Sequence, residues 1–253
     1  MHKSILASAV IATASASLFA GSAMAQQQSY NVPTRGFTRE RGGIVEEGSA
    51  QVDLATGIGA MGNVNQLGGT SGGIRLGTPG SEVIINQSNM SGANGTNTDM
   101  FVKFGMQPLA LNDNNINWNV YGGVFYIDID PDGQGQGTDY LNLGAGAAFT
   151  MDIDALKLNV NPQLVLDDTT PDRDTRFEFG FGAHYQLPDT DFGRFSPGIE
   201  YTVISADAQD DNLLTAGTRW AFNDRISMDF MVYADAGATA FGIPGFVRLN
   251  AAF

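Results

Sequence analysis

In several stretches of this chain polar residues occupy every second position, a spacing that puts them on one face of an extended strand, and ionisable side chains stand among them. Such mixed charges suit two kinds of chemistry. They can line a water-filled pore and set its ion selectivity, or they can pair across strands, because an unpaired buried charge is costly. The residues on these polar faces are Asp53, Lys103, Lys157, Arg176, Glu178, His184, Glu200, Arg219, Arg225, Asp229 and Arg248.

A second group of carboxylates has the spacing of calcium ligands. Asp128, Asp130 and Asp132 stand at alternate positions, Gly133 follows, and Asp139 is the twelfth residue of the run. The run resembles an EF-hand loop, which has oxygen ligands at positions 1, 3 and 5, glycine at 6 and a carboxylate at 12. It departs from that loop because position 12 is Asp rather than Glu and because strands flank it. The sequence leaves two interpretations, weakly bound calcium or an acidic turn, and predicts no other cofactor.

The segments that must position these residues alternate apolar and polar side chains, at the period of a β-strand. In residues 176–187, for example, Phe177, Phe179 and Phe181 share one face, and Glu178 and His184 share the other. A helix would scatter those aromatic rings around its axis. Segments of this kind cover 51–60, 72–77, 82–88, 100–107, 117–126, 141–150, 156–166, 176–187, 199–203, 214–222, 226–233 and 241–253. They predict about twelve antiparallel strands, or ten if the region before residue 82 is irregular.

The two faces indicate a membrane barrel rather than a soluble sandwich. The polar face is rich in Gly, Asn, Gln and charges of both signs, as in a barrel interior. The apolar face carries aromatic residues near the strand ends, as an interfacial girdle requires: Trp118, Tyr126, Phe149, Tyr185, Trp220 and Phe222. In lipid every backbone group must be paired, and a sheet achieves this by closing on itself. We therefore predict an all-β, transmembrane, antiparallel up-and-down barrel.

The last segment alternates up to the terminal residue, Phe253. This resembles the C-terminal strand of Gram-negative outer-membrane β-barrel proteins, which ends on an aromatic residue recognised by the assembly machinery. The resemblance covers the architecture of residues 49–253 and indicates no particular family. It implies an outer-membrane location, Phe253 as the assembly signal, and lipid, lipopolysaccharide and the barrel assembly machinery as partners. The oligomeric state is not indicated.

The N-terminal region divides into two parts. Residues 1–25 combine a basic start, an apolar stretch and an Ala-Met-Ala site, the pattern of a secretory signal peptide cleaved after Ala25. Residues 26–48 do not alternate, and Arg35, Arg39 and Arg41 mark a polar segment. This segment is either a periplasmic tail or a plug inside an acidic lumen. Residues 49–253 form the predicted barrel.

Placing Phe253 at the periplasmic end sets the side of every connection. The turns at 112–115, 152–154, 188–194 and 223–224 become periplasmic. The connections at 61–71, 89–98, 127–139, 167–175, 206–212 and 235–240 become extracellular, and they carry many Asp residues. Such acidic loops form either a solvated rim or a surface that divalent cations bridge to lipopolysaccharide phosphates.

Composition and charge exclude several functions. With 13 Lys and Arg against 27 Asp and Glu, the net charge of −14 repels nucleic acid. The chain has no cysteine, and beyond the signal peptide it has one histidine, His184, on a polar strand face near the periplasmic end. Barrel enzymes such as phospholipases and omptin-like proteases place their sites at the lipid face or the extracellular rim, so no enzyme is expected.

Two functions remain. One is a narrow passive channel for small polar solutes or ions, favoured because many interior positions are glycine and leave room. The other is a closed structural or interaction barrel that presents its acidic loops.

Overall fold

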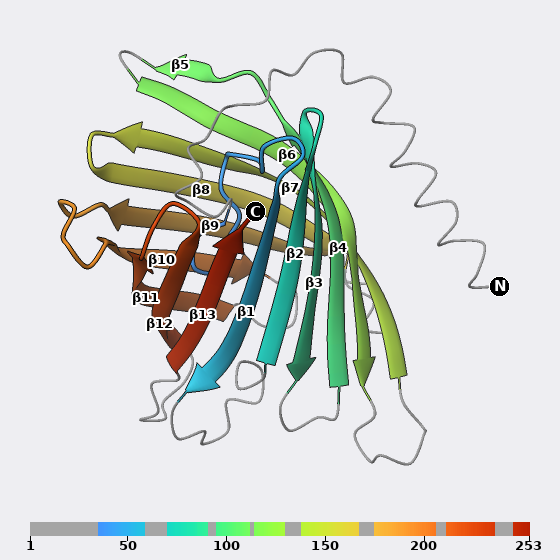
Figure 1. Ribbon diagram of the computed structural model, residues 1–253. Helices are drawn as coiled ribbons and strands as arrows, with labels where there is room; N and C mark the ends of the chain where they lie inside the picture. The colour runs from blue at the N-terminus through green and yellow to red at the C-terminus, as the bar shows by residue number, and fades with distance from the viewer. Residues whose placement is uncertain are drawn as a thin grey trace.

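The computed structural model describes residues 35–58, 70–90, 95–111, 114–129, 138–166, 175–205, 211–235 and 245–253. These residues form a single antiparallel sheet that curls into a barrel (Figure 1). Its strands are β1 (Ala50–Ile58), β2 (Thr70–Thr78), β3 (Ser81–Met90), β4 (Gly95–Gly105), β5 (Leu109–Leu111), β6 (Asn114–Ile129), β7 (Thr138–Ile153), β8 (Leu156–Leu166), β9 (Thr175–Tyr185), β10 (Arg194–Ser205), β11 (Asp211–Ala221), β12 (Ile226–Asp235) and β13 (Gly245–Ala252).

The wall of the barrel consists of twelve of these strands, because the short β5 pairs only with the start of β6. Each wall strand pairs with its sequence neighbours, and β4 pairs directly with β6. The barrel closes where β1 meets β13, with Gln51 opposite Ala252. The backbone groups of Ala50 and Phe253 then exchange two hydrogen bonds of 3.1 and 2.9 Å. The prediction of a closed barrel of about twelve strands is confirmed.

Side chains alternate between the two surfaces of the wall as predicted. Phe177, Phe181 and Tyr185 of β9 are exposed on the outside, whereas Glu178 and His184 are 6% and 3% exposed. This arrangement inverts that of a soluble protein, because the apolar groups face outward and the charges lie inside. None of the described residues forms a helix long and apolar enough to cross a membrane.

One end of the barrel carries short turns and the C-terminus, and we call it the turn end. The turns after β2, β7 and β11 lie here, and Asp154 adopts a positive φ of 52° in the second of them. Aromatic rings gather at the same end: Trp118 stacks on Phe149 at 5.7 Å, and Trp220 stacks on Phe195 at 5.6 Å. The other end, the loop end, holds the predicted extracellular connections, most of which lie outside the described residues.

Candidate functional site

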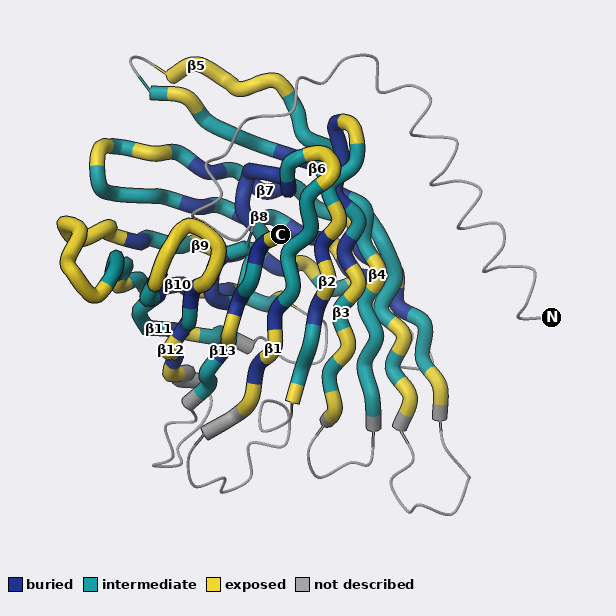
Figure 2. The backbone as a smooth tube through the Cα atoms, viewed as in Figure 1, coloured by how far each residue is buried: buried dark blue, intermediate teal, exposed yellow. Residues whose placement is uncertain are grey.

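The described part of the N-terminal region, residues 35–48, lies inside the barrel, and we call it the luminal segment. Figure 1 shows this segment, coloured blue, running within the ring of strands. Phe37, Arg41, Ile44 and Val45 are each at most 3% exposed, and Figure 2 marks buried positions in dark blue. The wall strands hold the segment through four clusters of polar contacts.

The first cluster surrounds Glu40. Its carboxylate accepts hydrogen bonds from Arg75 at 2.7 and 2.8 Å and from Lys103 at 3.0 Å. Glu82 completes the cluster, since it pairs with Arg75 at 2.9 Å and also accepts the Val45 amide at 3.0 Å. Burial by itself would raise the pKa of the Glu40 carboxyl, but Arg75 and Lys103 outweigh it and hold this pKa well below its usual range.

The second cluster surrounds Glu200 of β10. This carboxylate accepts the backbone amides of Phe37 and Thr38 at 2.6 and 2.8 Å, and the Thr38 hydroxyl at 2.8 Å. Its third neighbour is His184, whose Nε2 lies 2.9 Å away. The His184 ring also packs edge-on against Phe37, with centroids 4.6 Å apart. His184 is thereby engaged on both sides by the contacts that hold the luminal segment.

The third cluster surrounds Asp229 of β12, which is fully buried. Arg219 donates to it at 2.6 and 2.9 Å, and Arg248 donates at 2.6 and 3.0 Å. Arg248 uses its remaining donors on the carbonyl oxygens of Phe37 and Gly36, at 2.9 and 2.8 Å. Arg219 also donates, at 3.5 Å, to the carbonyl oxygens of Arg35 and Gly36. One carboxylate therefore orients two guanidinium groups, and both of these bind the backbone of the luminal segment.

The fourth cluster joins two arginines of the luminal segment, Arg35 and Arg39, to wall carboxylates. Arg39 pairs with Glu178 at 2.5 Å, and Arg176 pairs with the same carboxylate at 2.7 Å. Arg35 pairs with Asp53 at 3.3 Å. Arg35 and Arg39 of the segment thus pair with acidic residues of the wall, whereas Glu40 of the segment pairs with the basic wall residues Arg75 and Lys103.

Glycines of the barrel interior make room for this filling rather than for an open pore. A Cβ on Gly77 would lie 1.8 Å from the Glu46 carbonyl oxygen, and one on Gly180 would lie 3.0 Å from the Arg39 side chain. On β7, a Cβ on Gly146 would lie 2.6 Å from the Tyr121 ring. The argument that glycine positions leave the lumen open was therefore wrong for the part of the lumen that the structure describes.

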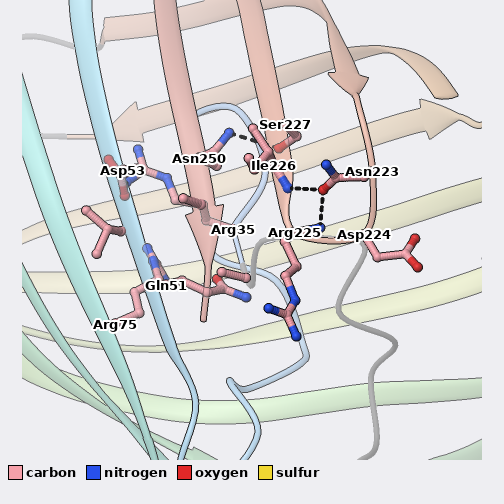
Figure 3. Close-up of a pocket in the computed structure, with 13 residues that line it drawn as sticks. Arg35, Gln51, Asp53, Arg75, Asn223, Asp224, Arg225, Ile226, Ser227 and Asn250 are labelled. Atoms are coloured by element: carbon pink, nitrogen blue, oxygen red, sulfur yellow. Dashed lines mark hydrogen bonds and ion pairs between the residues drawn. The ribbon is translucent and has the colours of Figure 1, made fainter. Parts of the chain in front are cut away.

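Among the described residues, two of the cavities lie near the turn end. The larger, of about 210 Å³, is lined by Arg41 of the luminal segment and by Lys157, Arg194 and Arg219 of the wall. The smaller, of about 20 Å³, has room for about one water molecule. Figure 3 shows it between Arg35 and Asp53 on one side and the turn at Asn223 and Arg225 on the other.

The residues predicted on the polar faces occupy three kinds of position. Most are at most 6% exposed and lie within the clusters described above: Asp53, Lys103, Glu178, His184, Glu200, Arg219, Asp229 and Arg248. Arg176 and Lys157 are partly exposed, and Lys157 pairs with Asp152. Arg225 was placed wrongly, because β12 begins only at Ile226 and Arg225 lies exposed in the preceding turn.

Arg75 and Glu82 belong to the site but were missed. They lie in the two strands whose alternation was weakest, so their faces were not assigned. Part of the signal was present in the sequence, because Arg75 stands two residues from both Gly73 and Gly77 and so shares a strand face with them. The position of Glu82 opposite Gly77 is given only by the register of the structure. The register itself depends on the turn at Pro79 and Gly80.

The predicted calcium loop falls largely outside the described residues. Asp128 and Asp139 are described, and they lie opposite each other in the β6–β7 register, both exposed. Asp130 and Asp132 lie beyond the described part. Calcium binding therefore stays a prediction.

No protein-family model and no curated protein matches this sequence. Solved structures do match it. The KdgM porin aligns with a TM-score of 0.55 over 80% of this chain and 99% of its own, at 9% identity. An outer-membrane channel, COG4313 from Pseudomonas putida F1, aligns with a TM-score of 0.50 over 83% and 97%, at 10% identity. The chain has the fold of an outer-membrane β-barrel. At these identities the likeness concerns the fold alone.

The outer surface of this outer-membrane barrel is apolar, as a location in a membrane requires. Exposed apolar side chains such as Leu54, Leu164 and Ile199 cover the outside of the wall. Such a surface is stable in hydrocarbon, where a closed sheet leaves no backbone group unpaired. The barrel lies in the outer membrane of a Gram-negative bacterium, as the sequence predicts.

Proposed function

We propose that this outer-membrane barrel is a passive channel for small polar solutes or ions that its own luminal segment closes in the conformation described. The observation that carries the proposal is the polar nature of the filling. Glu40, Arg39 and Arg35 of the segment bind wall residues through ion pairs, and three of the four clusters centre on a carboxylate that water could also solvate.

Energetics favour a removable filling over a permanent one. Ion pairs gain little over hydration, because charges that leave the pair recover water. An apolar core would instead lose its burial free energy outright on opening. Phe37, Ile44 and Val45 are the buried apolar side chains of the segment, and Arg41 is buried beside them, whereas Arg35, Arg39 and Glu40 form ion pairs with the wall.

Barrel size and the fold neighbours support the same proposal. Eight strands enclose just the space that side chains fill, so a wall of twelve encloses more. The two neighbours compared above are named as a porin and as an outer-membrane channel, and one KdgM structure is a complex with a disordered oligogalacturonate. A route for polar solutes is thus compatible with this architecture.

The second candidate is a closed structural or interaction barrel. The observation that favours it is the filled lumen, together with the buried network around Asp229. In that case the acidic loops, bridged by cations to lipopolysaccharide, would carry the function. The two candidates differ in whether the luminal segment ever leaves the lumen.

A catalytic function is not proposed. His184 would be the only imidazole of the mature chain, and it is buried between Glu200 and Phe37. A general base must reach a substrate proton within hydrogen-bond distance, and here the inserted segment occupies the space next to the ring.

The test is the planar-bilayer conductance of two refolded proteins, residues 26–253 and a variant that lacks residues 26–48. Heat-modifiable gel migration establishes that each barrel is folded. We expect the complete chain to be closed most of the time and the shortened variant to conduct in steady steps. In the conducting form, Arg176→Gln should shift the ion selectivity toward cations, since it removes a positive charge from the lumen.

If neither folded protein conducts, the channel proposal is overturned and the structural barrel is left as the candidate. Steady conductance of the complete chain, equal to that of the shortened variant, would show that the segment does not close the pore.

A further inference from the structure

The cavity of about 210 Å³ at the turn end contains Arg41, a buried arginine that forms no ion pair with any residue that the structure describes, although the carboxylates of Glu200, Asp229 and Asp152 are near enough to act on its charge. Arg41 extends from the luminal segment and is 3% exposed. Its Nε is buried and has no hydrogen-bond partner, and no ion pair to its guanidinium is formed by any residue that the structure describes. Burial, and then the nearby Arg219, lower the pKa of Arg41 to about 9. A buried guanidinium without an ion pair is costly, so this position favours a ligand that restores the lost interactions.

The other cations around the cavity each have a carboxylate partner. Lys157 pairs with Asp152, Arg194 with Asp189 at 2.9 Å, and Arg219 with Asp229 at 2.6 Å. All three residues line the same cavity, so their positive potential adds to that of Arg41. Asp152 and Asp154, both exposed at the edge of the cavity, act in the opposite direction and limit the affinity for an anion.

We propose that this cavity is a binding site for a small oxyanion of the phosphate type, held between Arg41 of the luminal segment and Lys157 and Arg219 of the wall. The planar guanidinium offers parallel donors that match the oxygens of such an anion, and charge-assisted hydrogen bonds of this kind are strong. The volume is sufficient, since it exceeds several times the ~30 Å³ share of one water molecule.

The site exists only while the luminal segment is in place, because Arg41 belongs to the segment and the other cations belong to the wall. By linkage, an anion that binds this arrangement stabilises the inserted state. Binding itself does not depend on whether the barrel conducts, so the site and the channel proposal can fail separately.

The test is isothermal titration of inorganic phosphate into refolded residues 26–253 in a chloride buffer, with folding checked by gel migration. We expect saturable binding of one phosphate, and Arg41→Gln should weaken it about tenfold or more, since it removes charged hydrogen bonds. Arg41 lies outside the wall, so this variant keeps the barrel. Arg225→Gln is the matched control: it removes the same charge from the same end of the barrel, outside this cavity, and should leave binding unchanged.

A second readout is the rate of amide hydrogen exchange in residues 36–45. Phosphate should slow exchange in the complete chain and leave it unchanged in Arg41→Gln. Absence of saturable binding in the folded wild-type protein would overturn the proposal. So would binding that Arg41→Gln and Arg225→Gln weaken equally, because the anion would then respond only to net charge.

Discussion

The carboxylate of Glu200 accepts a hydrogen bond of 2.6 Å from the backbone amide of Phe37, across 163 residues of sequence. The same carboxylate accepts the Thr38 amide, so a single wall side chain binds two successive amides of the luminal segment. This relationship anchors an irregular stretch of chain without adding it to the sheet. It also indicates where the insertion is most sensitive to substitution.

Glu200→Gln should loosen the luminal segment. An amide side chain offers one acceptor oxygen instead of two, and its NH₂ group opposes a backbone donor, so the inserted state should lose about 2 kcal/mol. Hydrogen exchange at the amides of Phe37 and Thr38 should become roughly 30-fold faster. Glu47→Gln, a substitution of the same type at an exposed position of the segment, is the control. Unchanged exchange in Glu200→Gln would contradict the anchoring role.

Gly42→Val should expel the luminal segment. A Cβ at this position would lie 1.9 Å from the carbonyl oxygen of Asn117 and 2.8 Å from the Thr150 amide nitrogen, and neither backbone group can move aside within the sheet. Limited trypsin digestion of the folded barrel should then cleave after Arg39 and Arg41, which the wild-type protein protects. In the control Gly122→Ala, a Cβ meets its nearest neighbour at 3.5 Å, so protection should persist.

Acid should release the luminal segment through Glu40. Arg75 and Lys103 depress the pKa of its carboxyl in the inserted state against the effect of burial, whereas the released segment has an ordinary carboxyl. The stabilisation is therefore complete above the ordinary pKa and is lost as the pH falls toward the depressed value, beginning between about pH 5 and pH 3. Trypsin is inactive at low pH, so the measurement is cleavage of the segment by pepsin, which is active in acid.

The matched variant for the acid experiment is Glu40→Gln, which cannot ionise. Its luminal segment should be cleaved more readily at neutral pH, assayed with trypsin, and its pepsin sensitivity should depend less on pH than that of the wild type. Identical acid profiles of the two proteins would show that Glu40 does not control the release.

Asp229→Asn should destabilise the barrel itself. The substitution leaves Arg219 and Arg248 buried without their shared counter-charge, and breaking a buried pair in this way costs about 3–5 kcal/mol in the free energy of unfolding. Urea unfolding from lipid vesicles, followed by tryptophan fluorescence, measures it. Asp152→Asn removes the exposed partner of Lys157 and should cost less than about 1 kcal/mol. A small effect at Asp229 would mean that water or the luminal carbonyl groups compensate both arginines.

The alternation of apolar and polar residues along the chain was enough to predict the strands of the barrel wall and the direction of their side chains. Because successive side chains of a strand point to opposite faces, the alternation in 176–187 assigns Phe177 and Phe181 to the outside and Glu178 and His184 to the inside without any knowledge of neighbours. The outward aromatic residues and the terminal Phe253 then predicted a barrel in the outer membrane. The errors came where alternation is weak or ends, at Arg75, Glu82 and Arg225.

What fills the barrel was decided only by the tertiary structure. The sequence offered a tail or a plug for residues 26–48, and it took interior glycines as open space. Pairing of Glu40 with Arg75 and Lys103, and of Arg39 with Glu178, depends on the registers of several strands and on the path of a segment that has no periodicity. Strand period is a property of adjacent residues, whereas charge pairing across a lumen joins residues distant in the chain. The sequence therefore determined which side chains face inward, and the closed barrel determined which of them meet.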